Sequence, residues 1–193
     1  MPGISDKLIY MGAGTFSLVA YLPGEIGKFV DSLRRRLNPG FAAWLPHVTI
    51  LSPRPLGTTP EEALALIREK CVFLDPFQAS LGRVLSFWPV NGVVYLSFTA
   101  GFQGLVDLHN LLNRDGLAFA ELYPYVPHVT VAQELDEASV GTVLEEVTRE
   151  WAWYRGEISL RVESLSLVRQ EPDKRWVDLG PIQLGRQLEP SRR

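Results

Sequence analysis

One short pattern occurs twice in this chain and constrains its fold more than any other feature. The tetrapeptide Pro-His-Val-Thr stands at residues 46–49 and again at 127–130. Each copy lies in the same expected order of elements, which is strand, helix, histidine strand, helix, strand. This repetition indicates a duplicated unit, so the sequence predicts two similar lobes.

The first copy lies in a half that apolar spacing and turn residues divide into five elements. These are a strand over 17–22, a helix over 25–37, a histidine strand over 46–51, a helix from an N-cap at Thr59 to about Cys71, and a strand from Phe77. Asn38-Pro39-Gly40 is expected to stop the first helix. Glu62 stands where it completes a capping box with Thr59.

The second half repeats this order after a hairpin turn at 89–92. Its predicted elements are a strand over 93–98, a helix near 102–113, the histidine strand over 127–131, a helix through 140–151, a strand from Ile158 and a last strand over 176–184. The alternation of apolar residues changes phase before Leu165, and a β-bulge near Glu163 is the expected cause.

The two halves are expected to pack as lobes of one domain. We place the first lobe at about 17–90, the second at about 91–184, and a loosely ordered polar tail at 185–193. Neither low-complexity sequence nor a Ser/Gly linker separates the halves. The lobes should therefore share a cleft.

Composition limits which binding partners and which cellular location we expect for the protein. The formal net charge is -3, so the chain lacks the excess of Lys and Arg that an extended nucleic acid duplex would need, although a small or terminal phosphate remains possible. The single cysteine, Cys71, permits no intramolecular disulfide and is interpreted as a small buried hydrophobe. Residues 1–10 lack the features of a secretory signal, and no run of about 18 apolar residues occurs. We expect a cytoplasmic monomer that does not bind membranes.

The repeated tetrapeptide places an imidazole and a hydroxyl side by side. Side chains two residues apart in a strand share a face, so His47 points the same way as Thr49 while Val48 points into the core. His128 and Thr130 are related in the same way. If the two lobes face each other, both pairs meet in one groove.

Two imidazoles in one groove suit the hydrolysis of a phosphodiester. Histidine titrates near neutral pH, so one of His47 and His128 can take a proton from water while the other protonates the leaving oxygen. Hydroxyls at Thr49 and Thr130 can donate hydrogen bonds to the non-bridging phosphate oxygens. Neither histidine has Asp, Glu or Cys nearby at ligand spacing, so we expect neither a metal nor a cofactor.

Other interpretations of the same residues remain open. The motifs could be a remnant of duplication in half-buried strands, although two polar groups on one buried face would add to the cost of burial. His109 lies outside the motifs and is interpreted as structural or solvated. Arg34-Arg35-Arg36 ends a helix and is favoured as a solvated face over a phosphate clamp.

Aromatic residues precede both motifs. Trp44 stands before the first motif, and Tyr123 and Tyr125 stand before the second. They could stack on a base or pack the start of the strands, and the sequence does not decide between these roles.

Two HxT motifs in two halves of a chain of this length resemble the 2H phosphoesterase superfamily, also called the 2'-5' RNA ligase-like or cyclic phosphodiesterase family. The similarity extends from Ser17 to Leu184. It implies a bilobal α+β fold with pseudo-two-fold symmetry. Each lobe is an antiparallel sheet with helices on its outer face, and the HxT strands line a cleft between the lobes.

The resemblance also implies an activity and its residues. It assigns catalysis to His47 and His128 and phosphate binding to Thr49 and Thr130, and leaves the acid and the base unassigned. The implied substrates are 2',3'-cyclic phosphates at RNA ends, related cyclic nucleotides, or 2'-5' phosphodiesters. Members that act on RNA ends often carry a basic residue after the second motif, where this chain has Ala132-Gln133-Glu134. A small nucleotide or another phosphorylated metabolite therefore remains an alternative substrate, and a binding module without turnover is the alternative function.

Overall fold

Eight antiparallel strands form one sheet in the computed structural model, which describes residues 14–41 and 43–186. In chain order they are β1 (Thr15–Tyr21), β2 (His47–Arg54), β3 (Phe77–Ser86), β4 (Val94–Ala100), β5 (Val129–Ala132), β6 (Ser159–Val162), β7 (Ser164–Gln170) and β8 (Trp176–Gln183). Their order across the sheet is β6-β3-β4-β5-β2-β1-β7-β8. The two HxT strands, β2 and β5, are neighbours at its centre.

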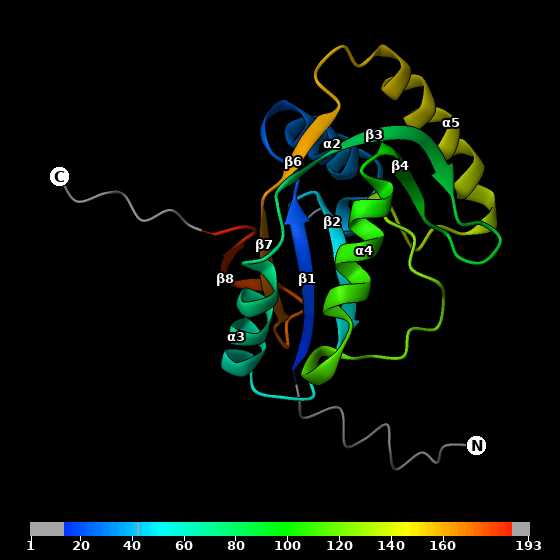
Figure 1. Ribbon diagram of the computed structural model, residues 1–193. Helices are drawn as coiled ribbons and strands as arrows, with labels where there is room; N and C mark the ends of the chain where they lie inside the picture. The colour runs from blue at the N-terminus through cyan, green and yellow to red at the C-terminus, as the bar shows by residue number, and fades with distance from the viewer. Residues whose placement is uncertain (1–13, 42, 187–193) are drawn as a thin grey trace.

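Helices cover the sheet, so the fold is α+β as predicted. They are α2 (Gly24–Leu37), α3 (Pro60–Cys71), α4 (Phe102–Leu112) and α5 (Glu137–Trp153), with short 3-10 turns at Pro39–Phe41 and Asp115–Leu117. Figure 1 shows α3 and α4 on the same side of β1 and β2, while α5 lies beside β3 and β4. The expected capping box at Thr59 begins α3, and α2 ends directly before Asn38.

The strand order is symmetric about the contact between β2 and β5. On each side the HxT strand is followed by the first strand of its own repeat, which is β1 beside β2 and β4 beside β5. Strands of the two halves also pair beyond these positions, because β3 of the first half pairs with β4 of the second, and β7 of the second half pairs with β1 of the first. The expectation of a separate sheet in each half is therefore not confirmed, since the halves before and after residue 90 exchange strands.

The expected β-bulge near Glu163 is wrong. Val162 ends β6, which pairs with β3, whereas Ser164 begins β7, which pairs with β1 and β8. At Glu163 the chain thus leaves one side of the sheet and joins the other. Sheet twist curls the two sides toward each other, so one residue suffices for the crossing. The change of phase marks a change of strand partners.

Buried side chains from strands in both halves of the sheet, together with side chains from all four helices, form one apolar core. Cys71 is fully buried in it, as predicted, and burial raises the pKa of its thiol to about 11. Among the described residues no helix is long and apolar enough to cross a membrane. The predictions for residues 1–10 and for most of the tail, from 187 onward, concern positions outside the described residues.

Candidate active site

The two HxT strands meet at a single residue pair, Val48 with Val129, in the middle of the sheet. Both valines are fully buried, and the side chains on either side of them in the sequence point to the opposite face. That face carries the predicted site residues, each of them half-buried: His47, Thr49, His128 and Thr130. Local strand geometry and one pair of valines thus bring the two motifs together.

One pocket of about 260 Å³ is lined by all four predicted residues. We call it the central pocket. Its other polar lining includes Arg34, Asn38, Ser52, Asn91 and Gln133. Juxtaposition of the two motifs is therefore observed, while the catalytic and phosphate-binding roles of their residues stay predictions.

The two imidazoles are held in the same way. His47 Nδ1 lies 2.6 Å from the carbonyl oxygen of Leu45, and His128 Nδ1 lies 2.7 Å from that of Val126. A carbonyl can only accept, so Nδ1 carries the proton in each ring. In the neutral imidazole this leaves Nε2 as a free acceptor, which is the atom a general base needs. When the ring is charged, Nε2 becomes a donor, as a general acid requires.

Aromatic rings desolvate both histidines. Tyr21 and Trp44 lie 6.4 and 6.5 Å from His47, and Phe87 and Tyr95 lie 5.0 and 5.2 Å from His128, between ring centroids. Burial lowers the pKa of His128. It also lowers the pKa of His47 to about 4, and the charge of Arg34 contributes in the same direction. Both rings are therefore neutral at pH 7 in the free protein.

This depressed pKa makes stability depend on pH. Unfolded His47 binds a proton below its ordinary pKa of 6.5, whereas folded His47 does so only near 4. The unfolded state is therefore favoured as pH falls through this window, and His47 costs about 2–3 kcal/mol by pH 4.5. We expect His47→Gln, which has no such titration, to gain that amount relative to wild type between pH 7.5 and 4.5 in urea unfolding. A difference that stays constant with pH would contradict the assignment.

The three arginines at the end of α2 have different environments. Arg35 and Arg36 form ion pairs on the surface, with Asp31 and with Glu146 and Glu150. The solvated-face interpretation is wrong for Arg34, which is buried and lines the central pocket. The position of Arg34 relative to the apolar residues of α2 could have predicted its burial.

Arg34 stands four residues after Val30, at the edge of the apolar face of α2. Its guanidinium donates to the carbonyl oxygens of Trp44, at 2.7 Å, and Phe41, at 2.9 Å. These contacts fix the segment that leads into the first motif. They also keep a positive charge beside the pocket.

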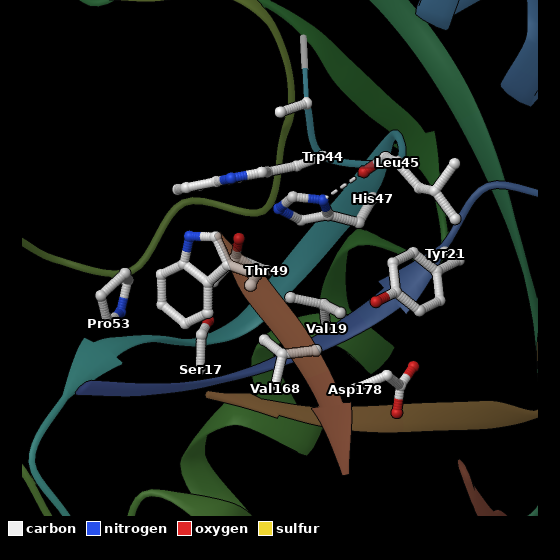
Figure 2. A pocket seen from close by; sticks show the side chains of 12 residues that line it. Ser17, Val19, Tyr21, Trp44, Leu45, His47, Thr49, Pro53, Val168 and Asp178 are labelled. Carbon is white, nitrogen blue, oxygen red and sulfur yellow. Dashed lines mark hydrogen bonds between the residues drawn. The ribbon is translucent and has the colours of Figure 1, made fainter. Parts of the chain in front are cut away.

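A second pocket adjoins the central one on the side of His47. This His47-side pocket has a volume of about 300 Å³ and shares Trp44, His47 and Thr49 with the central pocket. Figure 2 shows the rings of Trp44 and His47 along one side of it and Asp178 at the far end. Asp178 was not among the predicted residues, because β8 reaches the site only through its pairing with β7.

A third pocket adjoins the central one on the side of His128. This His128-side pocket measures about 560 Å³ and is mostly apolar, with Phe87, Phe119, Leu122 and Tyr123 in its lining. Tyr123 is 56% exposed and free to meet a ligand. Tyr125 is fixed instead, since its hydroxyl donates to Thr49 O at 2.7 Å. Tyr125 therefore packs the start of the second HxT strand, while stacking of Tyr123 on a base stays a prediction.

His109 is structural, as one interpretation of the sequence had it. The ring is buried, with Nδ1 2.8 Å from Ile50 O, and it stacks on Tyr125 at 4.0 Å between centroids and 4° between planes. Beyond Val48 the strand β2 pairs no further with β5. His109 and Tyr125 therefore take up the carbonyl groups of Ile50 and Thr49 that a paired strand would otherwise satisfy.

Comparison with known proteins identifies the family. The family model of the 2'-5' RNA ligase superfamily matches residues 22–174. The chain belongs to the 2'-5' RNA ligase superfamily. The match contains both HxT motifs and all the strands from β2 to β7.

Two curated proteins and a solved structure resemble the chain over most of its length. A protein of Oceanobacillus iheyensis named as a phosphoesterase is 26% identical over 174 residues, which are 87% of this chain and 97% of that protein. Another, from Bacillus pumilus, is 29% identical over 130 residues, 67% of this chain and 75% of that protein. The crystal structure of E. coli LigT complexed with 3'-AMP has a TM-score of 0.63 at 21% identity and covers 90% of this chain and 99% of its own, which shows a shared fold.

Proposed function

We propose that the chain is a phosphodiesterase in which His47 and His128 act as acid and base without a metal ion. The observation that carries the proposal is the pair of imidazoles that line one pocket, each with Nδ1 tied to a carbonyl group and with Nε2 unpaired among residues 14–41 and 43–186. Cleavage of a phosphodiester needs a proton acceptor and a proton donor on opposite sides of phosphorus. Two symmetry-related imidazoles provide both functions.

The remaining groups of the central pocket suit the phosphate. Hydroxyls of Thr49 and Thr130 donate to the non-bridging oxygens, where charge builds up in the transition state. Arg34 adds a positive charge that the backbone carbonyls already hold in place. In residues 14–41 and 43–186 no three His, Cys, Asp or Glu side chains are grouped so that they could hold a metal. The donor set therefore suits acid/base chemistry better than metal chemistry.

Substrate binding must also change the protonation of the site. Both imidazoles have a lowered pKa in the free protein, so the one that acts as acid has to gain a proton. A phosphate anion beside a half-buried imidazole favours its charged form and raises its pKa. The substrate thus supplies the charge that completes the acid/base pair. Either histidine can be the acid, depending on how the substrate lies.

The pockets on either side of the central pocket suit a phosphoester with a nucleoside. The E. coli LigT structure complexed with 3'-AMP, and another complexed with phosphate, fit the idea that this fold binds such molecules. We propose a 2',3'-cyclic phosphate, a related cyclic nucleotide or a 2'-5' phosphodiester as the substrate. The binding module without turnover remains the second candidate, because both histidines are neutral in the free protein and binding alone needs no proton transfer.

A chelation experiment tests this function. We expect the protein to hydrolyse one or more members of a panel of nucleoside 2',3'-cyclic phosphates and short 2'-5' linked oligonucleotides, at the same rate with and without EDTA. The double variant His47→Ala/His128→Ala, purified in parallel, should be inactive and so exclude a contaminating enzyme. Activity that EDTA abolishes would overturn the metal-free mechanism. Ligand-dependent thermal stabilisation without product would favour the binding module instead.

A further inference from the structure

The His47-side pocket combines aromatic walls with one negative charge. Trp44 and Trp176 form a corner in which the rings are 5.0 Å apart and nearly perpendicular, at 81°. Tyr21 adds a third ring, and Val19 and Val168 add aliphatic surface. Flat bases stack on such aromatic faces, with a contribution of about 1–3 kcal/mol per base. Its volume of about 300 Å³ leaves room for one base.

Asp178 is the single charged carboxylate in this pocket, and its described lining contains neither Lys nor Arg. Oδ1 of Asp178 accepts one hydrogen bond, from Gly180 N at 2.7 Å. Burial raises the pKa of the Tyr21 hydroxyl to about 12, and the charge of Asp178 and a hydrogen bond to its carboxylate act in the same direction, so Tyr21 is a second donor to Asp178. A carboxylate can accept about four hydrogen bonds. Asp178 therefore has capacity for donors on a ligand.

The sign of this charge restricts what the pocket can hold. A phosphate group would meet the Asp178 carboxylate and be repelled, so phosphate belongs in the central pocket beside Arg34. A carbonyl oxygen that faced Asp178 would be disfavoured for the same reason. An amino group would donate to it. The pocket thus distinguishes bases by the group they present at the end remote from His47.

We propose that the His47-side pocket binds the base of a nucleotide substrate and that Asp178 selects bases that carry an exocyclic amino group. This inference rests on the proposed function, because it places the phosphate of the same substrate between His47 and His128. Cytosine and uracil form the matched pair, since an amino group in one stands where the other has a carbonyl oxygen. Asp178 would accept a hydrogen bond from the first and repel the second.

The test compares 2',3'-cyclic CMP with 2',3'-cyclic UMP. We expect kcat/KM of the wild type to favour the cytidine ester by roughly tenfold, the usual size of discrimination by a hydrogen bond to a base edge. In Asp178→Asn the amide both donates and accepts, so the preference should fall to about one or reverse. Asp173→Asn is the matched control, because Asp173 bonds to Arg175 in the turn after β7 and does not line the pocket. It should keep the wild-type preference.

Each outcome separates this inference from the proposed function. Equal hydrolysis of the two esters by the wild type, or a preference that persists in Asp178→Asn, would overturn the role of Asp178 while leaving the phosphodiesterase in place. If neither ester is hydrolysed, calorimetric binding of 3'-CMP and 3'-UMP decides. A preference for 3'-CMP that Asp178→Asn removes would support the pocket even though these two esters are not turned over. Absence of binding would overturn the base pocket, while the substrate panel with and without EDTA decides separately on the phosphodiesterase.

Discussion

Replacing either His47 or His128 by alanine is expected to lower kcat by about 10²–10⁴, the usual size of an acid or base contribution. The two rings are held alike, each with Nδ1 tied to a backbone carbonyl and with no hydrogen bond from Nε2 to any residue in the described part of the chain. Loss of either ring therefore removes one of the two proton transfers. Steady-state kinetics on a substrate identified in the panel measures the effect, and circular dichroism checks the fold.

The third histidine provides a control of the same residue type. His109 is buried and contacts the backbone at Ile50, outside the lining of the central pocket. His109→Gln keeps a side-chain donor for that carbonyl and should change kcat by less than about tenfold, although it can lower stability. A kcat that survives in both His47→Ala and His128→Ala would overturn the two-histidine mechanism. An equal loss in His109→Gln would show that general disturbance of β2 accounts for the effect.

Much of the site was predictable because its signal is local. Alternation along a strand places His47 beside Thr49 and His128 beside Thr130, whatever the tertiary structure. Repetition of the motif then predicts that the two strands are equivalent. The structure agrees, since they meet at Val48 and Val129 and line one pocket.

The exchange of strands between the repeats was not predictable, since it depends on pairing between segments far apart in the chain. Apolar alternation shows that 77–86 and 164–170 are strands, but it is silent about their neighbours in the sheet. Asp178 is a residue that could not be predicted for this reason. It belongs to β8, which joins the sheet beside β7, and only the pairing of β7 with β1 brings it near His47. The spacing of residues in the sequence does not indicate that Asp178 lies near His47.

Arg54→Met is expected to lower the free energy of unfolding by about 3–5 kcal/mol, as is usual when one partner of a buried ion pair is removed. Arg54 is only 2% exposed. Its guanidinium contacts Glu121, Asn113 Oδ1 at 2.6 Å and Ser52 Oγ at 3.1 Å. Methionine fills similar space but leaves the Glu121 carboxylate without its cation. Urea unfolding, followed by fluorescence, measures the loss.

A second variant separates charge from packing. In Arg54→Met/Glu121→Gln the uncompensated carboxylate is gone, so part of the lost stability should return. The surface pair of Arg175 with Asp173 is the control, because both side chains are more than half exposed, and Arg175→Met should cost less than about 1 kcal/mol. If Arg54→Met costs no more than this control, the buried pair does not stabilise the fold. If the double variant is no better than the single one, lost packing rather than the unpaired charge explains the effect. Since Arg54 ends β2 and Glu121 lines the His128-side pocket, the same ion pair links this wall of the candidate active site to β2.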